Sequence, residues 1–308
     1  MSDIAHELST VPPAPSVATV GNFDGVHRGH QTLLRRAVHA AADAGMRAVA
    51  VTFEPHPAAV LDPAAVPLRL QSLQERVEML AAAGVDLVLV LPFTREVAEL
   101  EPAEFVGRVL VDRLRAVRVV VGVNFRFGRR AAGDVAVLAS LGADHGFVAE
   151  AVTLTEQDGV AISSTSIREH LAGGDVGWAR RALGRPYALT GTVIAGEGRG
   201  RTIGVPTANL AVGEDRVLPA DGVYAGHARV EGIDHPAVTN VGLRPTFGAG
   251  GRTVECHLLD GDHDLYARDL RITFEHRLRG ERRFDGVDQL VDQIRRDVDQ
   301  AKGLLAGG

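Results

Sequence analysis

The chain has 308 residues, which is room for two domains, and it carries 33 Lys and Arg against 39 Asp and Glu, a formal net charge of −6. Because Lys302 is the only lysine and Cys256 the only thiol, the composition excludes a P-loop, a catalytic lysine upstream of residue 302, disulfides and cysteine-rich zinc sites. Split at Pro186, the chain has 18 cations against 21 anions before that point and 15 against 18 after it, −3 on each side, so neither half has the basic surplus of a nucleic-acid-binding module.

The first residues, MSDIAHELST, contain acidic side chains and no long apolar stretch, so they lack the pattern of a signal peptide. No segment reaches the roughly 18 apolar residues that a membrane span needs. We therefore expect a soluble, cytoplasmic protein with neither a membrane nor a nucleic acid as its partner. The sequence leaves the oligomeric state open.

Short β-branched runs alternate with helical patterns up to about residue 150. The strand-like runs are 17–21, 47–53, 86–93 and 118–123, and the helical patterns are 30–45, 72–84, 104–114 and 134–146. Gly45, Gly84 and Gly146 follow helical patterns at points where a left-handed C-cap is expected. Because the strands are continuous apolar runs, this half predicts a doubly wound α/β domain with a parallel sheet that binds ligands at the carboxyl ends of its strands.

The first predicted strand ends in the segment GNFDGVHRGHQ, residues 21–31, which leads into a helix. The N–H groups and dipole of a helix start favour an anion, and His27 and His30, three residues apart, project from the same side of its first turn. Gly29 leaves space for a phosphate to approach the backbone. Two imidazoles there suit a reaction in which negative charge builds on phosphorus, although a lone histidine at such a position is more often a surface or capping residue.

Three later stretches also follow strand ends or open helices: TFEPHP at 52–57, GVNFRFG at 122–128 and ISSTSIR at 162–168. The last offers the hydroxyls and N–H groups of Ser163, Ser164, Thr165 and Ser166. With Arg168 behind them, these groups suit a triphosphate bound without lysine, although the stretch taken by itself is better explained by an ordinary helix N-cap. For the stretch 122–128, the alternative is a loop whose aromatic rings fill the core.

Together these segments resemble the HxGH nucleotidyltransferase superfamily, and the eleven-residue version resembles its branch of bacterial FMN adenylyltransferases. The resemblance implies a nucleotidyltransferase-like fold in which His27 and His30 are catalytic. It also implies flavin binding by Asn124, Phe125 and Phe127, through a hydrogen bond and ring stacking. The ATP-binding residues that it implies are Gly21, Phe23, Asp24, Gly29, Ser163, Ser164, Thr165 and Arg168.

From Tyr187 the chain changes to short strands broken by Gly, Pro and Asp, which predicts a small antiparallel barrel or sandwich. The strand-like runs are 187–196, 222–230, 235–242, 253–260 and 269–280. The segment 287–302 predicts a closing amphipathic helix with an apolar face made by Val287, Leu290, Val291, Ile294 and Val298. We expect two domains, residues 1–186 and 187–308, joined by short helices before Pro186.

The second half contains a glycine-rich stretch, GEGRGRTIGVPTANL, at residues 196–210. It does not fit the dinucleotide-binding pattern GxGxxG, because Arg201 and Ile203 stand where the final glycine would fall. Thr207 and Asn209 are two residues apart on an extended segment, so a hydroxyl and an amide oxygen lie on the same side, where both can face Mg²⁺. A flexible hairpin loop with polar residues is an equally good reading of this segment alone.

Glu255 and His257 share one face of the strand-like run 253–260, and in a small barrel such a carboxylate is ordinarily solvated. With the PTAN segment, however, this run resembles the riboflavin kinase domain. The further matching stretches are 221–226, 239–248, 278–284 and 293–297. The resemblance implies that Glu255 removes a proton from the ribityl hydroxyl and that Thr207 and Asn209 hold the metal. The residues implied in ATP binding are Gly196, Gly198, Arg199, Gly200, Arg201 and Gly204.

Joined in this order, the halves resemble the bacterial bifunctional riboflavin kinase/FMN adenylyltransferases, also called FAD synthetases, over nearly the whole chain. The resemblance implies two sites: riboflavin and ATP give FMN and ADP at one, and FMN and ATP give FAD and pyrophosphate at the other, with Mg²⁺ as the metal. In one departure, Ala267 stands where the family pattern has glycine, which concerns a local turn. Two alternatives stay open: nucleotidyl transfer to another phosphorylated metabolite, and a nucleic-acid-binding barrel, against which the charge and the 5% aromatic content argue.

Overall fold

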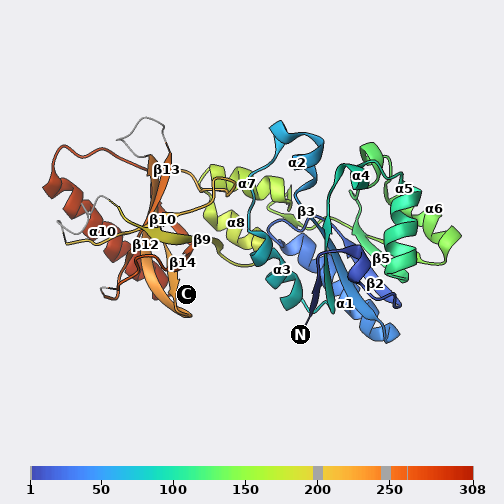
Figure 1. Ribbon diagram of the computed structural model, residues 1–308. Helices are drawn as coiled ribbons and strands as arrows, with labels where there is room; N and C mark the ends of the chain where they lie inside the picture. The colour runs from blue at the N-terminus through green and yellow to red at the C-terminus, as the bar shows by residue number, and fades with distance from the viewer. Residues whose placement is uncertain (1, 197–203, 244–250, 262, 308) are drawn as a thin grey trace. The chain divides into compact units, whose positions relative to one another are not determined.

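A computed structural model describes residues 2–196, 204–243, 251–261 and 263–307 (Figure 1). The chain divides into two compact units, Met1–Ser164 and Thr165–Gly308. None of the helices in the described ranges is long and apolar enough to cross a membrane. The division comes earlier than the expected boundary at 186/187, because the helices α7 (Ser164–Ala172) and α8 (Val176–Leu183) group with the second unit, where α8 packs on two of its strands.

The first unit contains a parallel sheet of six strands in the order β1-β4-β3-β2-β5-β6. The strands are β1 (Asp3–Ala5), β2 (Ser16–Val20), β3 (Arg47–Glu54), β4 (Leu87–Pro92), β5 (Ala116–Gly122) and β6 (Val148–Val152). The four central strands are those predicted from the sequence. The two edge strands were not predicted, because β1 has only three residues and β6 is half-exposed along its length, so neither gives an apolar run.

Helices cover both faces of this sheet, as Figure 1 shows. On one face α1 (Arg28–Ala44) and α3 (Leu73–Ala82) pack against a cluster that includes Val17 of β2. On the other face, α5 (Pro102–Phe105), the π-helix η3 (Val106–Arg113) and α6 (Val135–His145) contribute to a cluster that includes Ala18, the next residue of β2. Because successive residues of a strand point to opposite faces, one apolar strand serves two cores. The doubly wound α/β prediction is confirmed.

The remaining elements of the first unit are short. They are η1 (Leu8–Thr10), α2 (Pro57–Leu61), η2 (Pro63–Ala65), α4 (Arg95–Ala98), η4 (Arg129–Ala131) and the hairpin of β7 (Glu156–Gln157) and β8 (Val160–Ala161). Gly45 and Gly146 are left-handed C-caps with φ of 62° and 81°, as expected, and Gly84 has φ of 90° directly after the C-cap of α3. Glycine adopts this conformation without the steric cost that a Cβ brings.

The second unit is a closed antiparallel barrel of six strands, which confirms the barrel prediction. Its strands follow the order β12-β13-β10-β9-β14-β11, and β11 pairs with β12 to close the ring, while β15 pairs with β11 at a different part of that strand from β14. The strands are β9 (Tyr187–Ile194), β10 (Ala208–Ala211), β11 (Gly222–Val230), β12 (Ile233–Leu243), β13 (Arg252–Leu258), β14 (Asp269–Phe274) and β15 (His276–Arg279). The buried rings of Tyr187, Tyr224 and Phe274 meet within this unit.

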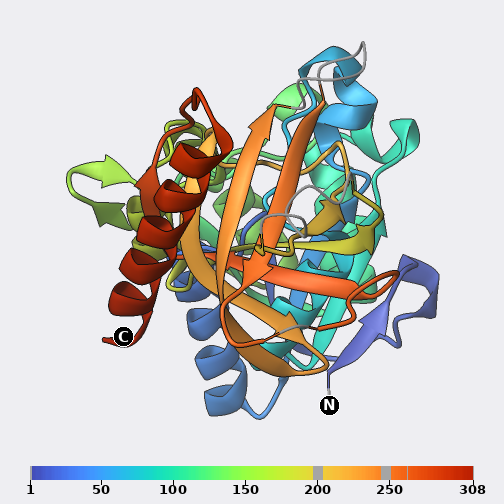
Figure 2. The ribbon, with the colours of Figure 1, turned by 90° about the vertical axis from the view of Figure 1, so that its left-hand side faces the viewer.

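The predicted closing helix is α10 (Val287–Leu305), which lies along β11, β12 and β15 (Figure 2). Its packed face differs from the predicted one at two positions. Val287 is 60% exposed, whereas Asp297 is buried and its carboxylate accepts three bonds of 2.8–3.1 Å from Arg279 of β15. An ion pair therefore anchors the middle of a helix that the sequence pattern would dock by apolar contacts alone.

Candidate active sites

The loop between β2 and α1 is held in an unusual backbone conformation. Phe23, Gly25 and Val26 have positive φ angles of 51°, 84° and 36°. A positive φ is common for glycine but rare for phenylalanine, and rarer still for the β-branched valine. Phe23 and Val26 are both buried in the cluster beneath α1, so the core fixes these two residues in place. Strained backbone kept in place by its surroundings is typical of functional loops. Phe23 is wholly buried, so the structure favours a core-filling role for it over the expected contact with ATP.

His27 and His30 meet at the start of α1, as the sequence predicts. His27 is the N-cap residue, and its Nδ1 accepts a bond of 3.4 Å from the backbone N–H of His30. The two rings stack with centroids 3.6 Å apart and planes inclined by 20°. A Cβ on Gly29 would lie 3.2 Å from two atoms of the His27 ring, so the space that this glycine opens accommodates the imidazole.

The protonation of His30 follows from this packing. Burial lowers its pKa well below the ordinary value of 6.5, and the neighbouring His27 ring lowers it further. Its Nδ1 is buried, with no hydrogen-bond partner among the residues that the structure describes. His30 is therefore neutral at neutral pH, and an anion bound beside it favours the protonated form.

A network of two arginines and a glutamate lies behind this loop, and sequence reasoning missed it. Arg76 of α3 is only 6% exposed, and it donates to the carbonyls of Asn22 and Phe53 at 2.9 and 3.2 Å and to the carboxylate of Glu54 at 2.7 Å. Arg69 binds the other carboxylate oxygen of Glu54 at 2.9 Å. Arginine on a predicted amphipathic helix normally faces solvent, so the pattern gives no signal that Arg76 fixes the end of β3 to the loop.

Asp24 and Ser164 connect the loop to two other segments of the first unit. Asp24 is 6% exposed, and its carboxylate accepts the backbone N–H of Leu70 at 3.0 Å. The Ser164 hydroxyl donates to the Asp24 carbonyl at 2.8 Å, so the serine-rich stretch meets the histidine loop as expected. The buried carboxylate favours a positioning role for Asp24 over contact with a nucleotide. Thr165 is exposed, and it belongs with Arg168 to the second unit.

The three residues expected to hold a flavin differ in exposure. Phe127 is buried, and its ring packs against Phe105 and stacks on Phe125, with centroids 6.0 and 5.3 Å apart. A Cβ on Gly133 would lie 2.6 Å from the Phe127 ring, so the backbone of Gly133 also packs closely against this ring. The structure thus favours the core-filling alternative for Phe127. Asn124 is exposed and Phe125 is half-buried, which leaves these two able to meet a ligand.

In the barrel, strand pairing brings the predicted polar residues together. Asn209 of β10 and Asn240 of β12 are both direct register partners of Glu255 on β13, one on each side. Residues paired in this way lie on the same sheet face with Cβ atoms about 5 Å apart. Nδ1 of His257 lies 2.7 Å from the carbonyl of Pro206, which fixes the segment before Thr207 to β13. Asn240 lies in the matching stretch 239–248, but its position beside Glu255 depends on register that the sequence does not give.

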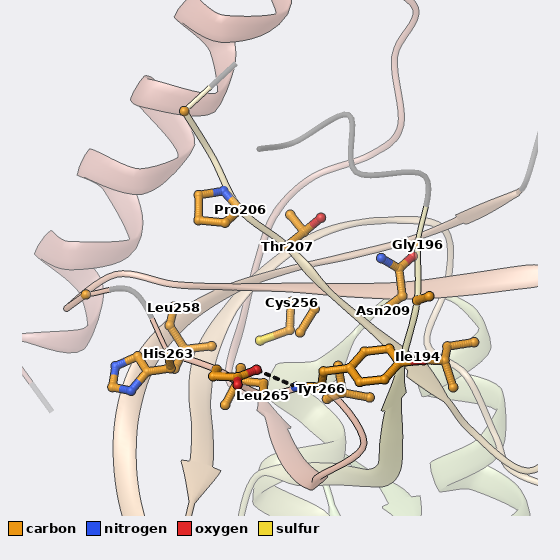
Figure 3. Close-up of a pocket in the computed structure, with 16 residues that line it drawn as sticks. Ile194, Gly196, Pro206, Thr207, Asn209, Cys256, Leu258, His263, Leu265 and Tyr266 are labelled. Atoms are coloured by element: carbon orange, nitrogen blue, oxygen red, sulfur yellow. Dashed lines mark hydrogen bonds between the residues drawn. The ribbon is translucent and has the colours of Figure 1, made fainter. Parts of the chain in front are cut away.

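A pocket of about 790 Å³ lies next to Asn209 (Figure 3). Of its lining, the sequence had indicated Gly196 and Gly204 and the polar residues Thr207 and Asn209. Figure 3 shows Thr207 and Asn209 on one side, with Leu265 and Tyr266 on the other. Glu255 does not line it; Cys256, on the opposite face of the same strand, does. A largely apolar pocket with a few convergent polar groups is typical of sites for small molecules and cofactors.

Two further features bear on this pocket. A Cβ on Gly196 would overlap the side-chain amide of Asn209, so glycine is required there for close approach. Burial raises the pKa of the Cys256 thiol to about 12, so Cys256 is an inert wall residue rather than a nucleophile. Gly204 has φ of 78° and shares the pocket lining. Gly198, Arg199, Gly200 and Arg201, also expected to bind ATP, lie outside the described residues.

Comparison with known proteins gives both units a family. The family model described as FAD synthetase matches residues 10–166, and the model described as riboflavin kinase matches residues 183–305. The bifunctional riboflavin kinase/FMN adenylyltransferase of Pseudomonas fluorescens is 42% identical over 94% of this chain and 93% of its own length. The enzyme of the same name from Escherichia coli K12 is 39% identical over 95% of this chain and 93% of its own length. The one from Bacillus subtilis is 34% identical over 96% of this chain and 94% of its own length.

The chain belongs to the bifunctional riboflavin kinase/FMN adenylyltransferase family. The resemblance found in the sequence is thereby confirmed. A crystal structure titled as a macrolide-efflux protein from Streptococcus pneumoniae has the same fold, with a TM-score of 0.90, 31% identity and 98% coverage of both chains. The histidine loop lies in the matched FAD synthetase domain, and the row of Asn209, Glu255 and Asn240 lies in the matched riboflavin kinase domain.

Proposed function

We propose that the two units catalyse successive steps in making a flavin cofactor, each at its own site. The riboflavin kinase domain transfers the γ-phosphoryl group of ATP to riboflavin, and the adenylyltransferase domain transfers the AMP group of a second ATP to the resulting FMN. The observation that carries this proposal is the separate placement of two different chemistries: a stacked histidine pair at a helix start, and a carboxylate flanked by amides in a barrel.

In the kinase step, an oxygen atom of the ribityl hydroxyl attacks the γ-phosphorus of ATP. A new P–O bond forms, the bond from the γ-phosphorus to the bridging oxygen breaks, and ADP leaves. Glu255 accepts the hydroxyl proton. Its position in the strand row beside Asn209, which also lines the pocket, suits an acceptor alcohol held against a nucleotide in that pocket.

Thr207 and Asn209 would hold Mg²⁺ in this domain. Their donors are a hydroxyl and an amide oxygen on one wall of the pocket, and oxygen ligands of this kind fit Mg²⁺. When bound, the ion neutralises charge on the ATP phosphates. Gly196, which has no Cβ, leaves room for the side-chain amide of Asn209. The glycine-arginine loop 196–204 is proposed to bind the ATP.

In the adenylyl step, a phosphate oxygen of FMN attacks the α-phosphorus of ATP. A P–O–P linkage forms, and the bond from the α-phosphorus to the next bridging oxygen breaks, releasing pyrophosphate. His27 and His30 stabilise the charge that builds on the phosphorus, because their stacked rings lie at the helix start and an anion beside His30 favours its protonated form. Ser164 reaches the same loop, and with Thr165 and Arg168 it is proposed to hold the departing pyrophosphate.

Two single variants test the assignment, with products separated by chromatography after incubation with riboflavin, ATP and Mg²⁺. His30→Ala is expected to lower FAD formation from FMN by about 10²- to 10³-fold while FMN still accumulates from riboflavin. Glu255→Gln is expected to lower riboflavin phosphorylation by about 10²- to 10⁴-fold and leave the conversion of FMN to FAD intact.

Matched controls are His39→Ala, on the exposed side of α1, and Glu214→Gln, an exposed carboxylate before β11. Both are expected to retain both activities. Loss of both activities in either test variant, with the controls unaffected, would contradict the two-site assignment. A Glu255→Gln enzyme that phosphorylates riboflavin at the parental rate would show that Glu255 is not the base. Location in the cytoplasm stays a prediction.

A further inference from the structure

The barrel carries a cluster of metal-ligating side chains that neither proposed reaction uses. Among the described residues, His235, Asp260 and His263 form the only group of three such side chains whose ligand atoms all lie within 4.8 Å of one another. His235 lies on β12, whereas Asp260 and His263 lie in the segment after β13. We propose that these three side chains form a site for a divalent transition metal of the Zn²⁺ class.

The geometry of the donors supports this site. Nδ1 of His235 lies 2.8 Å from one carboxylate oxygen of Asp260, and Nε2 of His263 lies 3.8 Å from the other. The second separation is too long for a hydrogen bond. The two imidazole centroids are 4.6 Å apart. In a tetrahedral site with bonds of about 2.0–2.2 Å, donors lie roughly 3.3–3.5 Å apart, so shifts of about 1 Å bring all three onto one ion.

The backbone already brings the two segments together. The N–H of Leu259 donates to the carbonyl of Pro236 at 2.9 Å, one residue from Asp260 on one side and from His235 on the other. Gly261 turns the chain with φ of 142°, so that Asp260 and His263 face each other. The side chain of His235 is 12% exposed, whereas those of Asp260 and His263 are 40% and 29% exposed, so an ion reaches the site from solvent.

The donor types select the metal. Two imidazole nitrogens and one carboxylate suit Zn²⁺, Co²⁺, Ni²⁺ or Cu²⁺, whereas Mg²⁺ prefers oxygen ligands throughout. The site is therefore distinct in chemistry from the proposed Mg²⁺ position at Thr207 and Asn209. Three protein ligands leave a fourth position open to water. His263 also lines the 790 Å³ pocket, so an ion held there restrains one wall of it (Figure 3).

Titration of the full-length, untagged chain with Zn²⁺ tests this proposal, in chelator-treated protein without flavin or nucleotide. Calorimetry is expected to find a Zn²⁺ equivalent that binds at least about tenfold more weakly in His263→Ala and His235→Ala, while His39→Ala binds like the parent. Co²⁺ is expected to give visible absorption bands of a low-symmetry site in the parent, and His263→Ala is expected to lose them.

His263→Ala is the decisive variant, because the His263 side chain lies outside the barrel strands and its loss is expected to spare the fold. Equal Zn²⁺ affinity in the parent and in His263→Ala, or no Co²⁺ bands in the parent, would overturn the proposal. The outcome is independent of either flavin reaction, since no substrate is present. A chain that binds Zn²⁺ at these residues but lacks flavin activity would contradict the proposed function and leave the metal site standing.

Discussion

The His30 imidazole is kept neutral before any substrate arrives, because burial and the stacked His27 ring both disfavour its charge. We expect its Hε1 NMR signal to titrate with a pKa below the ordinary value of 6.5, and that pKa to rise when ATP and Mg²⁺ are added, because phosphate charge favours the imidazolium. The His30→Ala variant assigns the signal. A His30 signal that titrates at or above 6.5 in the free protein would contradict the packing described.

The same pKa sets a dependence of stability on pH. Because the pKa of His30 is lower in the folded than in the unfolded chain, the unfolded chain binds more protons as the pH falls through and below 6.5. The stability of the fold is therefore not reduced by this group above pH 6.5, and it falls as the pH drops below 6.5 towards the pKa of the folded chain. Calorimetric unfolding of the parent and of His30→Ala at pH 7.5 and 5.5 is expected to find a smaller loss on acidification in the variant.

Ala267 occupies a backbone conformation that suits glycine, with φ of 59°. Its N–H donates to the carbonyl of Val193, so pairing with β9 holds the turn in place. We expect Ala267→Gly to stabilise the second unit by about 0.5–1 kcal/mol, since relief of left-handed strain exceeds the entropy that glycine adds to the unfolded chain. Urea unfolding followed by fluorescence of Trp178, the only tryptophan, measures this. A lower midpoint than the parent would mean that the alanine is not strained.

The packing of α10 on the barrel includes an ion pair between Asp297 of the helix and Arg279 of β15. Asp297 is 2% exposed and binds the guanidinium of Arg279, while the Gln293 amide donates to the same carboxylate at 2.9 Å. We expect Asp297→Ala to destabilise the second unit by about 3 kcal/mol, because it leaves a partly buried guanidinium without its counter-ion. Trp178 fluorescence in urea reports it. Asp292→Ala, on the exposed side of the same helix, is the control, and equal midpoints for the two variants would contradict this role.

The sequence predicts an element well where its apolar periodicity is strong. It predicts poorly the positions that are decided by contacts between residues far apart in the chain. Strands β2 to β5 and helix α10 follow from local patterns. Burial of Asp297 and Arg76 does not, since each is paired with a residue far along the chain or in another element. The site residues divide in the same way: His27 and His30 are neighbours by helix geometry, whereas Asn240 reaches Glu255 only through strand register.

The whole chain is proposed to carry two sites, one in each compact unit, with FMN as the product of one and the substrate of the other. If FMN passes through solution, each inactive unit can be supplied by another molecule. We expect an equimolar mixture of His30→Ala and Glu255→Gln proteins to convert riboflavin to FAD, although neither does so alone. Chromatography of flavins over time checks this. A mixture that makes no FAD would mean that one molecule must perform both steps.

Closure of the barrel through β11 and β12 has a consequence for how copies of the chain meet. Among the described strands, the ring of six has no free hydrogen-bonding edge, so strand addition to them has only β15 to use. That strand is four residues long with the sequence HRLR, and short, charged edges pair poorly with a second chain. The fold thereby protects a β-rich unit against edge-to-edge aggregation.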